Sequence, residues 1–169
     1  LTTTRTLTID IAPANDTLAG ATPLNLSTGT SEYAATNVGA THDVDVPCLG
    51  PTVNRGADVF FRFTLTRREF VYADTLGAAW DTSLFLLDAE GRPVVARETC
   101  NDDASDAGLC PGLAGAHSML ATRLGPGTWY LAVSGCGAGR AELHFQHLPA
   151  GSGAVSRIAP SAAVQTVTG

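Results

Sequence analysis

Oxygen-bearing side chains are concentrated in a short segment between two cysteines of the chain. Within six consecutive positions it contains Asn101, Asp102, Asp103, Ser105 and Asp106. Ca²⁺ takes about six to eight oxygen ligands and tolerates irregular geometry, so this composition is typical of a calcium site. The alternative is a solvated turn in which the Asn and Asp side chains bond nearby backbone amides. On this segment alone, the two interpretations have equal weight.

A calcium ion would need further oxygens from elsewhere in the chain. Asn15 and Asp16, or Asp81, can supply them. The spacing Asn101-x-Asp103-x-Ser105 matches the first three ligands of an EF-hand loop. The sixth position is not Gly and the twelfth is not Glu, so the segment is not an EF-hand.

Side chains capable of catalysis are present, but not in catalytic arrangements. Ser134 has Ala132 before it and Cys136 after it where a nucleophile elbow needs glycines. His144 and His147 are three positions apart on an expected strand, so they face opposite sides and cannot bind one ion together. We expect no enzymatic activity.

The four cysteines, at positions 48, 100, 110 and 136, permit three disulfide pairings. The short polar loop favours Cys100–Cys110, which leaves Cys48–Cys136. A zinc site is disfavoured because the spacings contain no C-x-x-C pair. Disulfides form in oxidising compartments, so we expect a secreted, extracellular protein.

Composition excludes several classes of protein. The length of 169 residues suits one domain. The net charge is −6 and all ten basic residues are arginine, without the basic face that nucleic-acid binding needs. No apolar run reaches the roughly 18 residues of a membrane-spanning helix, so we expect no membrane span.

Short runs rich in Thr, Val and aromatic residues predict strands between Gly and Pro turns. They cover residues 2–11, 24–27, 32–38, 58–66, 69–76, 82–87, 93–98, 118–124, 128–134, 140–147 and 163–168. Alternation predicts that Phe61, Phe63 and Leu65 point inward, as do Trp129, Leu131 and Val133. One short helix is predicted at residues 17–21, capped by Asn15 or Asp16. The pattern indicates an all-β sandwich or barrel.

Five segments in order resemble the bacterial pre-peptidase C-terminal (PPC) domain family, in the cysteine-containing form of myxobacterial exported proteins. They are residues 15–22, 57–65, 80–86, 100–103 and 124–133. The resemblance implies a non-catalytic, jelly-roll-like antiparallel β-sandwich at residues 13–147, here disulfide-stapled. Such modules are attached to secreted peptidases and other exported proteins. Related collagenase modules bind Ca²⁺ through an acidic linker and a neighbouring loop, which match Asn15 and Asp16, and Asn101, Asp102 and Asp103.

The two ends lie outside this resemblance. Residues 1–12 form an N-terminal extension, and residues 148–169 combine a Gly/Ser linker with a strand-like end. We expect a structural or adhesive module whose terminal strands pair with other copies of the chain, giving extracellular fibres. One alternative is an accessory or secretion domain cleaved from a secreted peptidase-type precursor. Another is a calcium-dependent carbohydrate- or matrix-binding module, which requires Tyr33, Tyr72, Trp80 and Trp129 on an exposed face.

Overall fold

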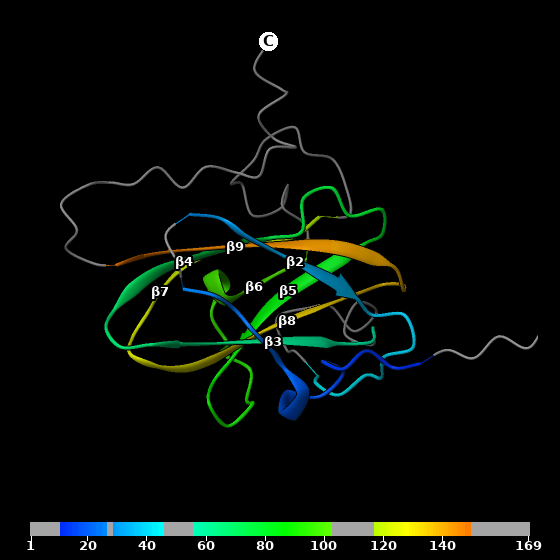
Figure 1. Cartoon of the computed structure of the whole chain (residues 1–169), viewed down its shortest axis with the longest axis horizontal. Helices are drawn as coiled ribbons and strands as arrows, with labels where there is room; N and C mark the ends of the chain where they lie inside the picture. Colours follow the sequence, from blue (N-terminus) through cyan, green and yellow to red (C-terminus); the bar gives the residue numbers. More distant parts are fainter. Residues whose placement is uncertain (1–10, 27–28, 46–55, 103–116, 150–169) are drawn as a thin grey trace, which may run out of the picture.

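The computed structural model describes residues 11–26, 29–45, 56–102 and 117–149, which form two stacked β-sheets (Figure 1). The first sheet has the order β1-β3-β8-β5-β6, formed by Thr22–Pro23, Val59–Leu65, Gly127–Gly135, Thr82–Leu87 and Cys100–Asn101. The second has the order β2-β9-β4-β7, formed by Ser31–Thr36, Arg140–Pro149, Glu69–Asp74 and Met119–Leu124. The predicted all-β sandwich is confirmed.

The main core lies between the sheets and follows the predicted alternation. Phe61 and Phe63 on β3 face inward and pair in register with Leu131 and Trp129 on β8. The ring of Phe63 lies 5.0 Å from that of Phe145, which projects from β9 in the opposite sheet. A slip of one residue would turn these side chains outward, so burial specifies the register.

A second apolar cluster covers the outer face of the five-stranded sheet. Phe60, Phe85 and Ala132 lie in one row of this face, and Leu18 and Val44 pack over them. β5 is therefore buried on both faces, which explains why it reads as a continuous apolar run rather than an alternating one.

Several local predictions differ from the structure. Residues 93–98 form no strand: Pro93 makes an isolated bridge to Leu87, and a short 3₁₀ helix, η2 (Arg97–Thr99), follows. Proline lacks the amide that a longer ladder needs. The first strand lies at Thr22–Pro23 instead of 24–27, and it is parallel to β3, whereas the other pairings of the described strands are antiparallel.

The predicted helix at residues 17–21 is a 3₁₀ turn, η1 (Leu18–Gly20). Its cap is Thr17, whose hydroxyl accepts from the Gly20 amide at 3.3 Å, because Asn15 and Asp16 are engaged elsewhere. The expected strands at 2–11 and 163–168 lie outside the described residues. None of the helices in the described ranges has the length and apolar character needed to cross a bilayer.

Candidate functional site

Residues 13–16, which we call the N-terminal linker, are hydrogen-bonded to the edge of the five-stranded sheet. The Asn15 carbonyl accepts from the Phe60 amide at 2.8 Å, and the Asn15 side-chain amide donates to the Phe60 carbonyl at 3.3 Å. Asn15 is 9% exposed. Residues 13–16 form a turn, in which the Asp16 amide donates to the Pro13 carbonyl at 3.1 Å, and the Asn15 side chain pairs polar atoms that would otherwise be buried and unpaired.

The loop at residues 41–45 holds the next residue of the linker. Oδ1 of Asp16 accepts from the Thr41 amide at 2.6 Å, and the Thr41 hydroxyl lies 3.3 Å from both Asp16 oxygens and from Oδ2 of Asp43. One hydroxyl thus lies between two carboxylates. This gathers oxygen ligands from two segments, but two carboxylates and a hydroxyl are fewer than a calcium ion takes.

The buried carboxylate of Asp58 is hydrogen-bonded to the backbone of this loop. Its Oδ2 accepts from the amides of Asp43 and Val44 at 2.9 and 3.0 Å, and the residue is 1% exposed. Burial raises the pKa of Asp58, although these amides, the Ser134 hydroxyl and nearby His42 act to lower it. The Asp58 carboxylate therefore holds the loop in place, although burial disfavours its charged form.

His42 lies at the rim of the same loop. Its Nδ1 is 2.9 Å from the Gly56 carbonyl, and its Nε2 is 3.1 Å from Oδ1 of Asp45. Partial burial lowers the pKa of His42, but the bonds to Asp45 and Gly56 and the charges of Asp58 and Asp45 outweigh it, so the pKa is raised. Both ring nitrogens therefore have partners, and the His42 side chain links Asp45 of the loop to the Gly56 carbonyl.

The structure does not bring the predicted calcium ligands together. Oδ1 of Asn101, on β6, accepts from the Met119 amide at 2.9 Å, and the Asp102 carbonyl accepts from the Ser118 hydroxyl. Two strands, β8 and β5, separate β6 from β3, where Asn15 is fastened. At about 4.8 Å per strand, the groups are roughly 14 Å or more apart.

Among the described residues of the predicted set, Asn15 and Asp16 therefore lie apart from Asn101 and Asp102, and Asp103 lies outside the described residues. The His, Cys, Asp and Glu side chains of the described ranges form no group of three or more placed to hold a metal. Calcium binding by either half of the set stays a prediction. Strand order, which the sequence pattern does not contain, is what separates the two halves.

The cysteines also depart from expectation. Cys136 is an exposed thiol in the β8–β9 turn, and burial, followed by the charges of Asp81 and Asp102, raises its pKa. Cys136 carries a thiol in this structure, which therefore does not contain the predicted Cys48–Cys136 bridge. Cys100 is disulfide-bonded. Cys48 and Cys110 lie outside the described residues, so the Cys100–Cys110 pairing stays a prediction.

Carboxylates surround a buried histidine on the outer face of the four-stranded sheet. The register of β2, β9 and β4 places Glu32, His144 and Asp74 in one row. Nδ1 of His144 is 2.7 Å from Oδ1 of Asp74, and their side chains are 8% and 0% exposed. The hydrogen bond to Asp74 raises the pKa of His144 against its burial, and the charges of Asp74, Glu32 and Glu142 raise it further.

His147 has a separate partner, as its position three residues along the strand predicts. Its Nδ1 is 2.6 Å from Oε2 of Glu69, and both side chains are buried. The two histidines therefore pair with different carboxylates of β4 and share no ligand. The sequence contains no signal for either pair, because the partners are 70 and 78 positions apart.

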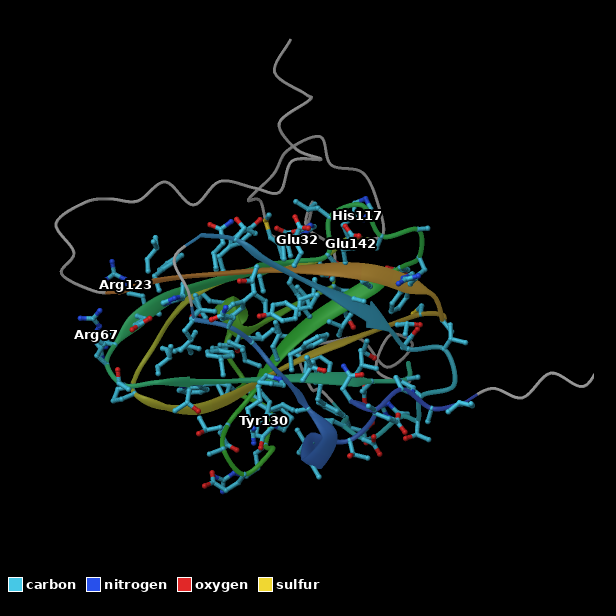
Figure 2. All side chains as sticks on the ribbon, viewed as in Figure 1. Glu32, Arg67, His117, Arg123, Tyr130 and Glu142 are labelled. Carbon is cyan, nitrogen blue, oxygen red and sulfur yellow. The ribbon has the colours of Figure 1, made fainter. Side chains whose placement is uncertain are left out.

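A shallow pocket of about 170 Å³ adjoins the histidine row. Its lining is Glu32, Tyr33, Ala34, Arg140 and Glu142. Figure 2 shows Glu32 and Glu142 near each other over β2 and β9. Ligand sites for small molecules are usually about 300–1,000 Å³. This pocket is smaller, and it presents charge without a nucleophile, so it can hold water or a small cationic group.

The aromatic residues do not form an exposed platform. Tyr72 is 4% exposed, and Tyr33, Trp80 and Trp129 pack partly buried against the main core. Nε1 of Trp129 donates to the Gly125 carbonyl at 3.1 Å. Their burial and packing remove the exposed aromatic face that the carbohydrate-binding alternative requires.

Comparisons with known proteins give little further information. No family model matches the chain, and no curated protein matches it. Among solved structures, it is similar to the pre-peptidase C-terminal domain of a collagenase from Bacillus anthracis, with a TM-score of 0.43 and 11% sequence identity. The match covers 75% of this chain and 93% of that chain. A likeness this distant carries no argument about function, so the geometry of the chain itself has to supply one.

Proposed function

We propose that the chain is a non-catalytic accessory module of an exported protein, built to hold the segment that enters it in a fixed position. The observation that carries this proposal is the linker contact. Asn15 bonds β3 through main chain and side chain, and Asp16 bonds the Thr41 amide. A module joined to other parts of a protein needs such a contact, because a loose linker would leave its orientation undefined.

The polar residues of the PPC-like segments support the same proposal. Asn15, Asp58 and Asn101 all bond backbone groups of other segments, and the indole of Trp129 closes its own turn. Each of these side chains stabilises the framework. A catalytic site would instead direct several such groups towards one open cavity.

The test joins the full chain to the C-terminus of a secreted carrier enzyme and compares it with the variant Asn15→Ala/Asp16→Ala. We expect the carrier's kcat to be unchanged by the module, and protease cleavage at the junction to be about thirtyfold faster in the variant, since two side-chain contacts of about 1 kcal/mol each are lost. Asn25→Ala, an exposed side chain, is the control. Equal cleavage rates would refute the linker role. Hydrolysis of peptide or glycoside substrates that is lost in His144→Gln would refute the absence of catalysis.

We further propose that the module assembles by strand addition, with β2 as the acceptor. β7, the other six-residue edge of its sheet, packs beside η2 and β6, and its Met119 amide is bonded by Asn101. The strand pairing of β2 in the described residues is with β9 alone, along Ser31–Thr36. An edge with unpaired amides and carbonyls is a template for another chain. The strand-like segments 2–11 and 163–168 have the composition to occupy it.

Deleting residues 1–10 or 163–169 separates this assembly from the fold. We expect one deletion to abolish fibres seen by negative-stain microscopy, while the far-ultraviolet spectrum stays that of a folded β-protein. Glu32→Pro would place a residue without an amide in the acceptor strand, and it should have the same effect. Fibres that persist in all three variants would contradict strand addition at β2.

A further inference from the structure

One end of the sandwich is rich in arginine. The turn between β3 and β4 carries Arg67 and Arg68, and Arg123 lies near the end of β7. All three are exposed, and Figure 2 shows Arg67 and Arg123 at the same end of the molecule. Among the described residues of these turns and strand ends, the one carboxylate is Glu69, which is 6% exposed and already lies 3.4 Å from Arg67. We call Arg67, Arg68 and Arg123 the arginine end.

The opposite end carries several aspartates, together with the exposed Arg140 at the start of β9. β3 leads from buried Asp58 to the arginine end over Val59–Leu65, a length of about 23 Å at 3.3 Å per residue. The loop beside Asp58 exposes Asp43 and Asp45, and the Asp45 side chain is 84% exposed. Asp16 contacts the same loop through Thr41. We call Asp16, Asp43 and Asp45 the aspartate end.

The net charge of −6 makes copies of the chain repel one another on average. The uneven distribution of charge gives one orientation in which close approach is favourable, with unlike ends facing each other. At physiological salt the Debye length is about 8 Å, so this attraction acts on contact. Charged patches of this kind determine orientation and partner choice more than they determine affinity.

We propose that the arginine end of one copy docks on the aspartate end of the next. The contact joins two different surfaces, so each association leaves one arginine end and one aspartate end unoccupied. Such heterologous contacts propagate into rows unless they close into a ring. This association is distinct from strand addition at β2, because it uses side-chain charge at the ends and needs neither terminal segment.

The test uses two neutralised variants of the full chain. Arg68→Gln/Arg123→Gln removes exposed charges of the arginine end and keeps Arg67, which pairs with Glu69. Asp43→Asn/Asp45→Asn does the same for the aspartate end and leaves the Asp43 amide, the group that bonds Asp58. Circular dichroism and thermal melting check that both variants fold as the unmodified chain does.

Sedimentation velocity is measured in about 20 mM and about 500 mM salt. We expect the unmodified chain to self-associate more strongly at low salt than at high salt, and any part that salt does not change belongs to strand addition at β2. Either variant alone should associate about tenfold more weakly, a loss equivalent to about 1.4 kcal/mol. An equimolar mixture should regain the salt-dependent association as 1:1 pairs, because each variant supplies one intact end.

Three results would overturn the proposal. The first is a monomeric unmodified chain at low salt; if that monomer binds polyglutamate, the arginine end serves another acidic partner. The second is association unaffected by salt, which would assign it to strand addition instead. The third is a mixture of variants that behaves like either variant alone. None of these results depends on the linker contact, so they leave the accessory-module proposal to its own test.

Discussion

Replacing His144 with leucine would leave the carboxylate of Asp74 buried without its partner. The Asp74 side chain is 0% exposed, its Oδ1 lies 2.7 Å from His144, and it retains a single bond from the Leu76 amide at 3.0 Å. Removing one member of a buried ion pair typically costs about 3–5 kcal/mol. Because the Leu76 bond remains, we expect about 3 kcal/mol for His144→Leu. For a chain of this length, this lowers Tm by about 6–12 °C.

The double variant separates the pair from simple loss of packing. His144→Leu/Asp74→Leu removes both charges and should cost less than the two single variants together, with a coupling energy of about 2 kcal/mol. The assay is urea unfolding followed by tryptophan fluorescence. Arg92→Gln is the control, because its partner Asp88 lies 2.8 Å away at an exposed site, where solvent screening leaves ion pairs little effect on stability.

The dependence on pH gives a second check on the same pair. The folded protein raises the pKa of His144 above its ordinary value of 6.5, first through the Asp74 bond. Stability from this group is therefore full below pH 6.5 and is lost as the pH rises through the raised value. The unmodified chain should exceed His144→Leu in stability by more at pH 5.5 than at pH 9. A coupling energy under about 0.5 kcal/mol, or a difference that does not change with pH, would refute the reasoning.

Three further predictions concern single side chains. Asn37 is 1% exposed and bonds the backbone of Ala57, Gly137 and Gly139, so Asn37→Ala should cost about 2–4 kcal/mol in urea unfolding, whereas the exposed control Asn25→Ala should be neutral. Burial raises the pKa of Asp58, so its stabilising contribution is present in acid and lost as the pH rises. Asp58→Asn should therefore be at least as stable as the unmodified chain at pH 7, and it should not be more stable at pH 3. A lower Tm of the variant at pH 7 would contradict this. If Cys100 pairs with Cys110, Cys110→Ser should lower stability by about 2–3 kcal/mol, and Cys136→Ser, measured beside it by thermal melting, should not.

Strands with a local pattern could be predicted from the sequence. β5 occupies Thr82–Leu87 as predicted, and β3 and β8 differ from prediction by one residue at each end. These segments combine β-branched or aromatic residues with nearby turn signals, so the information is contained within about ten positions. The prediction of a strand at residues 93–98 was wrong for a related reason. The apolar residues of this segment suggest a strand, but Pro93 has no amide to donate to the neighbouring strand.

The candidate site could be predicted only in part. Asn15 and Asp16 were identified as functional from their type and from the family resemblance, and the structure gives them a role in fastening the linker. The structure does not bring them beside Asn101 and Asp102, because strand order places β8 and β5 between the two groups. The pair of His144 and Asp74 could not be predicted at all, since opposite positions on β9 and β4 are related only by register.

The amino-acid sequence by itself determined the class of fold, the inward faces of its central strands and the acidic balance of the chain. These properties depend on side-chain periodicity and composition, which act locally. Tertiary structure alone decided which polar groups meet, which cysteine carries a thiol, and that Arg67, Arg68 and Arg123 lie at the other end of the sandwich from Asp43 and Asp45. Each of those outcomes depends on strand order and register, and the free energy that selects them comes from burying both sheets at once.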